Sequence, residues 1–564
     1  MAYRSAKIFF SFFVVIILTL IVYWESLDNQ FTTWDDPAYI INNPHIKELS
    51  VESVIRIFTM PQYLRNYQPL VLVSYAVDYH YNQLDAYGYH LTNLIIHLCN
   101  TIFVLIIFYC LTKGLIISTI VALFFGIHPM HVESVAWLSA RSDLLFAFFY
   151  LTSIIFYLAY HHRGELKRYY LFSLALFILA ILSKALAVSL PPVLLLLDYY
   201  GDRKFDRKML LEKIPFLIIA AAGGIVAFLG RTAVNIPGTA DTYSFMDRVL
   251  LGSYSTIDYL WKILFPARLC AIYNYPEKIN GSLQVEVWFY LLLFILILFA
   301  AVYSWRYSKK IFFGLMFFFL TIASVLPFFN LPLPIMADRY SYLPSLGLFF
   351  LLAVGSQKFG NKLSARINSR APHFILIAIL SIYIIWLSSL AYGRTKVWMD
   401  GVTLWSDVIS FYPNDSGSYK NRGMAYLTAG KYYEAKIDFD KALNLRPNYP
   451  DALIGRGISF VTQNYFDDAL KDFSNAIIFD PQNAPAYFNK GFTLSNLGRF
   501  EEAIQSYSRA IDLKHNYGEA YVNRGLMKLQ LSDTAGACSD LYRAAKDLHF
   551  KPAEEYYTEI CLKK

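Results

Sequence analysis

Two adjacent carboxylates, Asp35 and Asp36, stand in the stretch FTTWDDPAYI, just after the first apolar run of the chain. A carboxylate can take a proton from an incoming hydroxyl group, which is the work of a general base. A turn is the alternative interpretation, because Asp followed by Pro is typical of turns. The same loop holds Arg65, Tyr67 and Gln68. We predict a base in this loop and prefer Asp36 over Asp35.

A second polar cluster lies in GIHPMHVESVAWLSARSDLLFAFF, where His128, His131, Glu133, Arg141 and Asp143 stand between two apolar runs. Polar groups at a membrane boundary are costly unless they are satisfied or used. The two histidines have no third ligand at the spacing of a zinc motif, so zinc is not favoured. The acids and the arginine can bind substrate or form structural ion pairs, and both interpretations stay open.

Two further basic residues end apolar runs, Lys184 in LSKALAVSL and Arg339 in MADRYSYLPSLGL. A cation at this position can hold the phosphate of an anionic lipid. The structural alternatives are snorkelling of Lys184 to the membrane surface and an ion pair of Arg339 with Asp338. We expect these cations and the carboxylates to meet on one face of the membrane.

Membrane helices must position these residues, because 56% of the 564 residues are hydrophobic, only 16% are charged, and the mean hydropathy is +0.38. Apolar runs long enough to approach the thickness of a bilayer predict about eleven spans. They are residues 8–24, 91–112, 114–127, 142–160, 169–183, 186–200, 214–230, 285–304, 311–329, 340–355 and 373–392. Residues 247–266 read instead as an amphipathic helix at the interface.

The distribution of charge predicts the topology. Basic residues gather in the short loops 161–168, 201–213, 305–310 and 357–370, which the positive-inside rule places in the cytoplasm together with the N-terminus. The first run has no cleavage site after it and reads as an uncleaved span. An odd number of spans then places the Asp35–Asp36 loop and everything after residue 393 on the outer face.

The last part of the chain repeats with a period of 34 residues, seen in Gly423, Gly457, Gly491 and Gly525. Alanines form two more such columns, at residues 435, 469, 503 and 537 and at residues 442, 476, 510 and 544. This period, with small residues where paired helices approach closely, is typical of tetratricopeptide repeats. We predict an all-α protein with a polytopic domain at residues 1–393 and an α-solenoid of about four repeats with flanking capping helices at residues 394–564.

Charge and cysteine content argue against a nucleic-acid-binding protein and against a disulfide-rich protein. Residues 413–564 carry 19 basic and 19 acidic side chains, so the net charge of +8 belongs to the membrane part and nucleic acid is not expected as a partner. Five cysteines form no CxxC pair, and we expect them to be packing residues rather than a disulfide framework. They are Cys99, Cys110, Cys270, Cys538 and Cys561.

The motifs TWDDPAYIINNPHI, YHLTNLIIHLCN, HPMHVESVAWLSARSDLL, ADRYSYLPSLGL and RTKVWMDGVTLWSDVISFYPN, followed by the repeats, resemble a known family. It is the transmembrane and tetratricopeptide repeat-containing O-mannosyltransferases, and we expect a bacterial member. The resemblance implies a GT-C glycosyltransferase fold, a polyprenyl-phosphate-linked sugar as donor, and a catalytic acid in the first outer loop, which matches Asp35 and Asp36. In animal members the turn after the fifth span reads Lys-Glu, whereas here it is Lys184-Ala185, so donor specificity can differ.

The expected reaction moves a mannose-like hexose to a hydroxyl group, with Ser or Thr of an extracytoplasmic protein as acceptor, by an inverting displacement. Asp35 or Asp36 deprotonates the acceptor while Arg141, Lys184 or Arg339 stabilises the departing lipid phosphate, with His128, His131, Glu133 and Asp143 in the same binding region. No metal or other cofactor is expected, and a divalent cation on the Asp pair is the less favoured alternative. The repeats would hold the protein acceptor.

Two other functions stay open. A non-catalytic membrane-anchored scaffold would use the repeats to assemble extracytoplasmic proteins. A flippase for lipid-linked sugars would need ionisable residues near the middle of the membrane, whereas these charges gather at one face. Trp34 and Tyr39 either pack the first outer loop or stack on a sugar.

Overall fold

The computed structural model describes residues 2–60, 66–232, 243–276, 278–279, 282–329, 334–369 and 371–562. Arg65 lies outside these residues. The chain divides into two compact units, Met1–Asp400 and Gly401–Lys564. We call them the helical unit and the repeat unit and describe each by itself.

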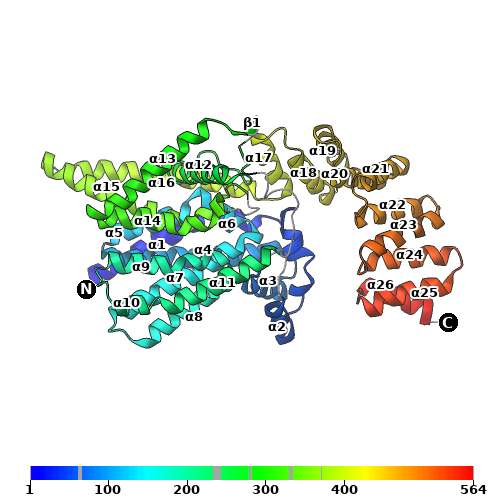
Figure 1. Cartoon of the computed structure of the whole chain (residues 1–564), viewed down its shortest axis with the longest axis horizontal. Coiled ribbons are helices and arrows are strands. Elements are labelled where there is room, and N and C mark those ends of the chain that lie inside the picture. Colours follow the sequence, from blue (N-terminus) through cyan, green and yellow to red (C-terminus); the bar gives the residue numbers. More distant parts are fainter. Residues whose placement is uncertain are drawn as a thin grey trace. The chain divides into compact units, whose positions relative to one another are not determined.

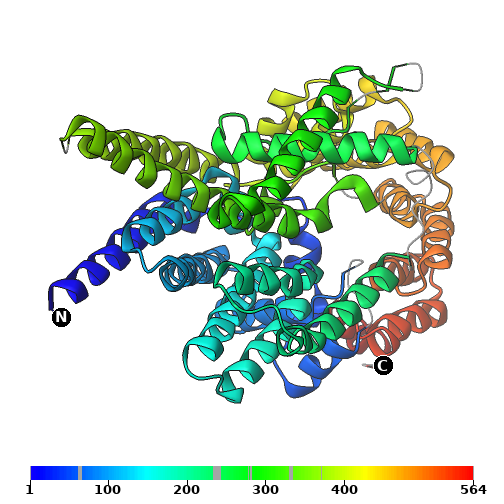
Figure 2. The same ribbon diagram turned by 60° about the vertical axis from the view of Figure 1, so that its left-hand side comes forward.

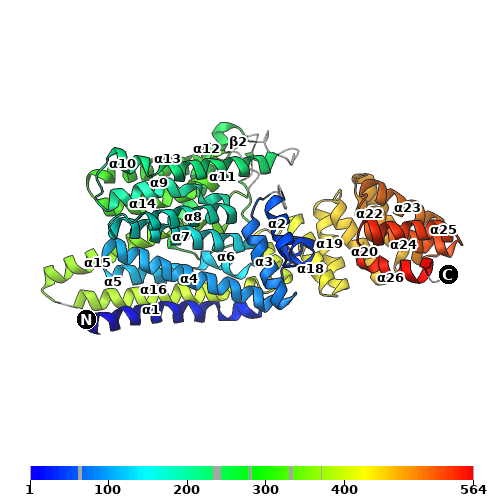
Figure 3. The same ribbon diagram turned by 90° about the horizontal axis from the view of Figure 1, so that it is seen from below.

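The helical unit is a bundle of mostly parallel and antiparallel helices (Figures 1 and 3). Its α-helices are α1 (Ala2–Tyr23), α2 (Val51–Thr59), α3 (Pro69–Asn82), α4 (Ala86–Thr112), α5 (Leu115–Ile127), α6 (Val132–Ala136), α7 (Arg141–His162), α8 (Lys167–Ser183), α9 (Leu190–Tyr200), α10 (Arg207–Leu211), α11 (Ile214–Thr232), α12 (Phe245–Leu264), α13 (Glu286–Tyr303), α14 (Lys309–Ile322), α15 (Ser345–Ile367) and α16 (Ala371–Val397). Among the described residues, the strands are β1 (Lys278–Ile279) and β2 (Ser282–Leu283), which pair antiparallel. The prediction of an all-α protein is confirmed.

Helices of the bundle are long and apolar enough for a multi-pass membrane protein. Within the described residues, six qualify by length and composition, or up to seven if the pair Leu115–Ile127 and Pro129–Ala136, bent by 52°, is one span. Predicted spans at 169–183, 186–200, 311–329 and 340–355 correspond to α8, α9, α14 and α15, which are shorter, more charged or followed by 3₁₀ turns. The count of eleven therefore stays a prediction. Figures 2 and 3 show α1, in dark blue, along one side of the bundle, where it contacts α4, α5 and α16.

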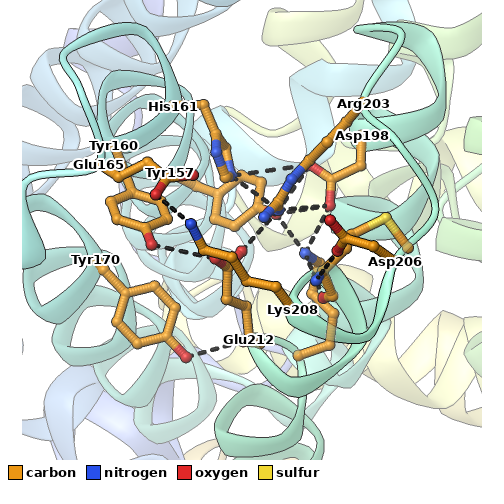
Figure 4. A network of polar contacts seen from close by, with 12 residues as sticks. Tyr157, Tyr160, His161, Glu165, Tyr170, Asp198, Arg203, Asp206, Lys208 and Glu212 are labelled. Atoms are coloured by element: carbon orange, nitrogen blue, oxygen red, sulfur yellow. Dashed lines mark hydrogen bonds and ion pairs between the residues drawn. The ribbon is translucent and has the colours of Figure 1, made fainter.

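A polar hub joins α7, α8, α9 and the segment between α9 and α11 (Figure 4). The buried Asp198 carboxylate accepts hydrogen bonds from Tyr157 Oη at 2.8 Å and Lys213 Nζ at 2.6 Å. Arg203 bridges this carboxylate to Glu212, at 3.3 and 2.6 Å. Buried charges are tolerated when they are paired and hydrogen-bonded in this way. The hub fixes α7 and α8, whose opposite ends adjoin the contacting residues Asp143 and Lys184.

The repeat unit is a solenoid of helix pairs with flanking helices. Its elements are α17 (Gly401–Phe411), α18 (Ser416–Thr428), α19 (Tyr432–Leu445), α20 (Pro450–Thr462), α21 (Phe466–Phe479), α22 (Ala484–Asn496), α23 (Phe500–Leu513), α24 (Gly518–Gln530), α25 (Thr534–Tyr542), the π-helical η11 (Arg543–Asp547), α26 (Lys551–Tyr557) and η12 (Thr558–Leu562). The predicted glycine column lies where helices touch: a Cβ on Gly457 would be 2.6 Å from the Phe473 ring. Both alanine columns are fully buried.

The prediction that all five cysteines are packing residues is wrong for two of them. Cys538 on α25 and Cys561 on η12 form a disulfide, because the packing of the C-terminal helices brings their Cα atoms to 5.7 Å. The pairing could not be deduced from spacing alone. It ties the last helical turn to the last repeat.

A bidentate ion pair between an arginine and an aspartate sixteen residues later recurs through the repeats. Arg456 on α20 binds Asp472, sixteen residues later, through two hydrogen bonds of 2.7 and 2.8 Å, and Asp440, sixteen residues earlier, at 2.6 Å. Arg422 and Arg524 make the equivalent pairs with Asp438 and Asp540. In the third repeat the two columns hold Lys490 and Ser506 instead. The third repeat therefore lacks the bidentate pair that joins the two helices of the other repeats.

We predict that Lys490→Arg with Ser506→Asp stabilises α22 and α23. A bidentate, partly exposed pair contributes about 0.5–1.5 kcal/mol, which slows local opening about 2- to 10-fold. Hydrogen exchange of these helices in the full chain measures the change. Each single substitution is the control, since neither one alone forms a bidentate pair between an arginine and a carboxylate, and equal exchange in the double and single variants would contradict the role of this pair.

Candidate active site

A cavity of 520 Å³ lies in the helical unit beside the first loop. One wall is apolar and comes from α8, the following 3₁₀ turn η6 (Ala185–Ser189) and α11. Its residues are Ile178, Ile181, Leu182, Ala185, Leu186, Ile219, Ala222, Gly223, Val226 and Ala227. A second, polar wall comprises Asp35, Tyr39, Asn66, Tyr67, Gln68, Ser139, Asp143, Lys184, Arg339 and Tyr340. The cavity is therefore shaped for a molecule with an apolar and a charged part.

The apolar wall depends on close contact between α8 and α11. A Cβ on Gly223 would lie 2.6 Å from Ile181 Cγ2, so glycine permits this approach. Ile178 and Val226 line the cavity and are 43% and 42% exposed. The wall is thus continuous with the exposed apolar surface of the helical unit.

Asp36 is a structural carboxylate in this fold. Its side chain is fully buried and does not line the cavity. Oδ2 accepts hydrogen bonds from Thr32 N at 2.8 Å and Thr32 Oγ1 at 2.9 Å. Oδ1 accepts from Ser139 N at 3.0 Å and Ser139 Oγ at 2.5 Å. These four bonds staple the first loop to the 3₁₀ turn η5 (Leu138–Ala140) and leave no carboxylate position for a substrate.

Asp35, the neighbour of this staple, lines the cavity. Its carbonyl accepts hydrogen bonds from Ala38 N and Tyr39 N, both at 3.0 Å, which start the short π-helical turn η2 (Pro37–Ile41). Burial raises the pKa of the Asp35 carboxyl, and the positive charge of Arg339 opposes that rise. Asp35 therefore presents to the cavity a carboxylate more basic than an ordinary aspartate.

Three tryptophans hold the loop that carries Asp35. Trp34 stacks on Trp137, with ring centroids 4.7 Å apart, and Trp137 stacks on Trp398 at 5.4 Å. Such stacking stabilises the loop beyond the effect of the apolar area that the rings bury. The structure thus uses Trp34 to pack the loop, whereas Tyr39 lines the cavity and its hydroxyl accepts a hydrogen bond from Asn66 Nδ2 at 3.2 Å.

Two cations of the polar wall are each paired with a buried carboxylate. Lys184 Nζ lies 2.7 Å from both oxygens of Asp143. Arg339 binds Glu133 through its guanidinium, and its backbone N–H donates to the same carboxylate at 2.9 Å. The side chains of Lys184 and Arg339 are 14% and 15% exposed, against 1% and 2% for their partners. Each carboxylate therefore holds a cation whose remaining surface faces the cavity.

This pairing decides two alternatives. Arg339 pairs with Glu133, whereas Asp338 accepts a hydrogen bond from Tyr273 Oη at 2.7 Å. Lys184 pairs with Asp143, so snorkelling alone does not account for its position. Sequence reasoning missed Tyr340, whose ring lies 5.5 Å from Lys184 Nζ and 4.9 Å from the Arg339 guanidinium. The sequence feature that could have indicated Tyr340 is its position directly after Arg339.

Three other predicted site residues lie away from the cavity. Arg141 is fully buried, forms an ion pair with Asp78 and donates to Asn93 Oδ1 at 2.7 Å. His128 and His131 are fully buried and bind the carbonyls of Ile263 at 3.0 Å and Phe125 at 2.8 Å. In the part of the chain that the structure describes, no three His, Cys, Asp or Glu side chains gather as metal ligands. Arg141 and both histidines thus hold helices together.

We predict that Asp36→Asn lowers the melting temperature of the purified chain, whereas Asp35→Asn does not. An Asn amide group in the staple would face the donor groups of Thr32 or Ser139, and an unsatisfied buried polar group costs about 1–3 kcal/mol. Removing the partly buried charge of Asp35 relieves a desolvation cost instead. Thermal unfolding with the exposed Asp28→Asn as control measures this, and equal destabilisation by the two substitutions would contradict the assignment.

The chain is similar to several proteins whose names begin with protein O-mannosyl-transferase. The tetratricopeptide repeat family model matches residues 417–449 and 484–517. Protein O-mannosyl-transferase F38B6.6 of Caenorhabditis elegans is 25% identical over 463 residues, which cover 77% of this chain and 63% of the relative. Protein O-mannosyl-transferase TMTC3 of Homo sapiens is 23% identical over 488 residues, with coverages of 76% and 51%. The chain thus spans between about half and two thirds of the length of these relatives.

Among solved structures, a MamA fragment from Desulfovibrio magneticus RS-1 is similar over 27% of this chain and 85% of its own, with 22% identity and a TM-score of 0.25. The predicted resemblance to tetratricopeptide repeat-containing O-mannosyltransferases is confirmed by the named relatives, which align over about three quarters of the chain. The bacterial assignment stays a prediction.

Proposed function

We propose that this chain is a membrane glycosyltransferase that moves a mannose-like hexose from a polyprenyl-phosphate donor to Ser or Thr of an extracytoplasmic protein. The observation that carries the proposal is the cavity itself. It joins an apolar wall, two cations and one carboxylate of raised pKa within a single space. The names of the relatives support the same class of reaction.

The donor fits the cavity in two parts. The apolar wall of α8 and α11 would hold the first isoprene units, because it is continuous with the exposed apolar surface of the bundle. Lys184 and Arg339 would bind the lipid phosphate, since both face the cavity and charge-assisted hydrogen bonds to phosphate are strong. Arg141, which the sequence offered for this task, is already committed to Asp78.

Asp35 is the base in this proposal, in place of the Asp36 that the sequence favoured. Asp35 takes the proton of the acceptor hydroxyl, whose oxygen attacks the anomeric carbon from the face opposite the phosphate. The new C–O bond forms as the bond to the phosphate oxygen breaks, and the electron pair leaves with the phosphate. Lys184 and Arg339 stabilise that leaving group, so one carboxylate suffices where a glycosidase needs two.

The proposed reaction uses the chain's own cations instead of a metal ion. Asp35 and Asp36 are adjacent in sequence, yet the oxygens of Asp36 already accept four hydrogen bonds. The pair is therefore poorly suited to chelate a divalent cation. Lys184 and Arg339 supply the positive charge that the departing phosphate requires.

The proposed topology puts the N-terminus in the cytoplasm, and the first loop and the repeat unit on the outer face of a bacterial inner membrane. The charge bias of the loops supports it. The disulfide Cys538–Cys561 supports it independently, because disulfides persist in oxidising compartments outside the cytoplasm. The repeat unit would then hold the protein acceptor on the side of the active site.

We predict that Asp35→Asn lowers sugar transfer about 10²- to 10⁴-fold while the chain stays folded. The assay uses the purified chain in nanodiscs, a panel of polyprenyl-phosphate sugars and a Ser/Thr peptide. Asp28→Asn, an exposed position in the same loop, is the matched control. Retention of transfer within about threefold in Asp35→Asn would sink the assignment, and absence of transfer by the unaltered chain would favour a scaffold.

The pH dependence of transfer gives a separate prediction. The base must be ionised to act, and burial raises its pKa. On the acid side of the pH profile, kcat/KM should therefore fall at a pH above the ordinary pKa range of aspartate. Arg339 opposes the rise, so its loss raises the pKa of Asp35 further and moves this fall in kcat/KM to higher pH. The double variant Arg339→Gln with Glu133→Gln avoids an unpaired Glu133. A fall that stays in place or moves to lower pH would contradict the role of Asp35.

A further inference from the structure

The repeat unit contains a groove of 440 Å³ that the reaction does not use. It is bounded by α18, α20 and the start of α22, and we call it the repeat groove. Its lining residues are Lys420, Met424, Asp451, Ile454, Ile458, Asp480, Gln482, Asn483, Ala484 and Pro485.

The floor of the repeat groove is apolar. Met424 on α18 and Ile454 and Ile458 on α20 form it, and Met424 is 37% exposed. The column that contains Met424 and Ile458 continues with Phe492, which is 41% exposed. One apolar side chain of a ligand would be buried here, and removing its apolar surface from water favours binding.

The rim of the repeat groove is acidic. Asp451 stands in the first turn of α20, and Asp480 precedes α22. Lys420 is the cation of the lining, and its ammonium group donates to Asn421 Oδ1 at 2.6 Å. Burial lowers the pKa of Lys420, and Asp451 opposes that shift. Asp480 accepts hydrogen bonds from Gln482 N at 3.2 Å and Asn483 Nδ2 at 3.0 Å. Two carboxylates against one ammonium group leave the lining with a net negative charge, which favours a cationic ligand.

The acidic rim is particular to this place in the array. The column of Asp480 holds Arg446 one period earlier and Lys514 one period later. The column of Asp451 holds Gly417 and Pro485 in the flanking repeats. The carboxylates are therefore no part of the consensus that builds the solenoid, whereas the glycine and alanine columns are.

We propose that the repeat groove binds an extended polypeptide segment in which Lys or Arg stands two residues from a large aliphatic side chain. Alternate side chains of an extended chain point the same way and lie about 7 Å apart, so both would reach the groove. The side-chain amide of Gln482 offers partners to the peptide backbone, whereas the amide of Asn483 already binds Asp480 and the backbone N–H of Ala486. Resting on the proposed function, the groove selects acceptor proteins whose glycosylated segments carry this basic and apolar pair.

The test is fluorescence anisotropy with the full chain in nanodiscs. The probe is a labelled ten-residue peptide of Gly, Ser and Thr with a central Lys-Thr-Leu. Matched peptides carry Glu for Lys or Ser for Leu. We expect the Lys-Thr-Leu peptide to bind about fivefold or more tightly than either, because the Glu peptide replaces attraction to the acidic rim by repulsion and the Ser peptide loses the apolar contact with the floor.

The double variant Asp451→Asn with Asp480→Asn should bind the Lys and Glu peptides alike. Glu434→Gln with Asp467→Asn, which removes two exposed carboxylates from α19 and α21, should keep the discrimination. No binding, equal binding of the Lys and Glu peptides by the unaltered chain, or discrimination that survives the groove variant would overturn the proposal. Binding is measured without donor, so a failure of sugar transfer leaves this result readable by itself.

Discussion

The Asp36 carboxylate holds the first loop of the helical unit on the turn before α7, and the geometry of the cavity depends on that attachment. Four hydrogen bonds from Thr32 and Ser139 fill its two oxygens. A buried carboxylate is stable only when its oxygens find donors in this way. Because Asp35 is the next residue, the same bonds fix where its side chain enters the cavity. The stacked Trp34 and Trp137 secure the two segments a second time.

The two cations of the polar wall are also stable because each one has a partner. Lys184 and Arg339 are each held by one deeply buried carboxylate, so neither cation lies uncompensated in an apolar surrounding. Each keeps part of its surface for a ligand. Arg141 shows the contrasting case, since its donors are taken up by Asp78, Asn93 and the carbonyl of Tyr89. Exposure to the cavity, rather than charge, separates the residues that can bind phosphate from those that hold helices.

The sequence predicted those parts of the fold that follow from a repeated pattern or from a run of apolar residues. The 34-residue period located the helix pairs of the repeat unit, and apolar runs located the long helices of the bundle. It could not separate Asp35 from Asp36, because the difference comes from Ser139, more than one hundred residues away. The pairs Arg141–Asp78 and Arg339–Glu133 and the disulfide Cys538–Cys561 are likewise long-range contacts that no local spacing encodes.

A structure of the full chain in nanodiscs with a non-hydrolysable polyprenyl phosphonate sugar tests the account most directly. The account predicts the phosphonate within hydrogen-bond reach of Lys184 and Arg339, the lipid chain along α8 and α11, and the anomeric carbon facing Asp35. A head group bound elsewhere, or one whose anomeric carbon faces away from Asp35, would contradict it.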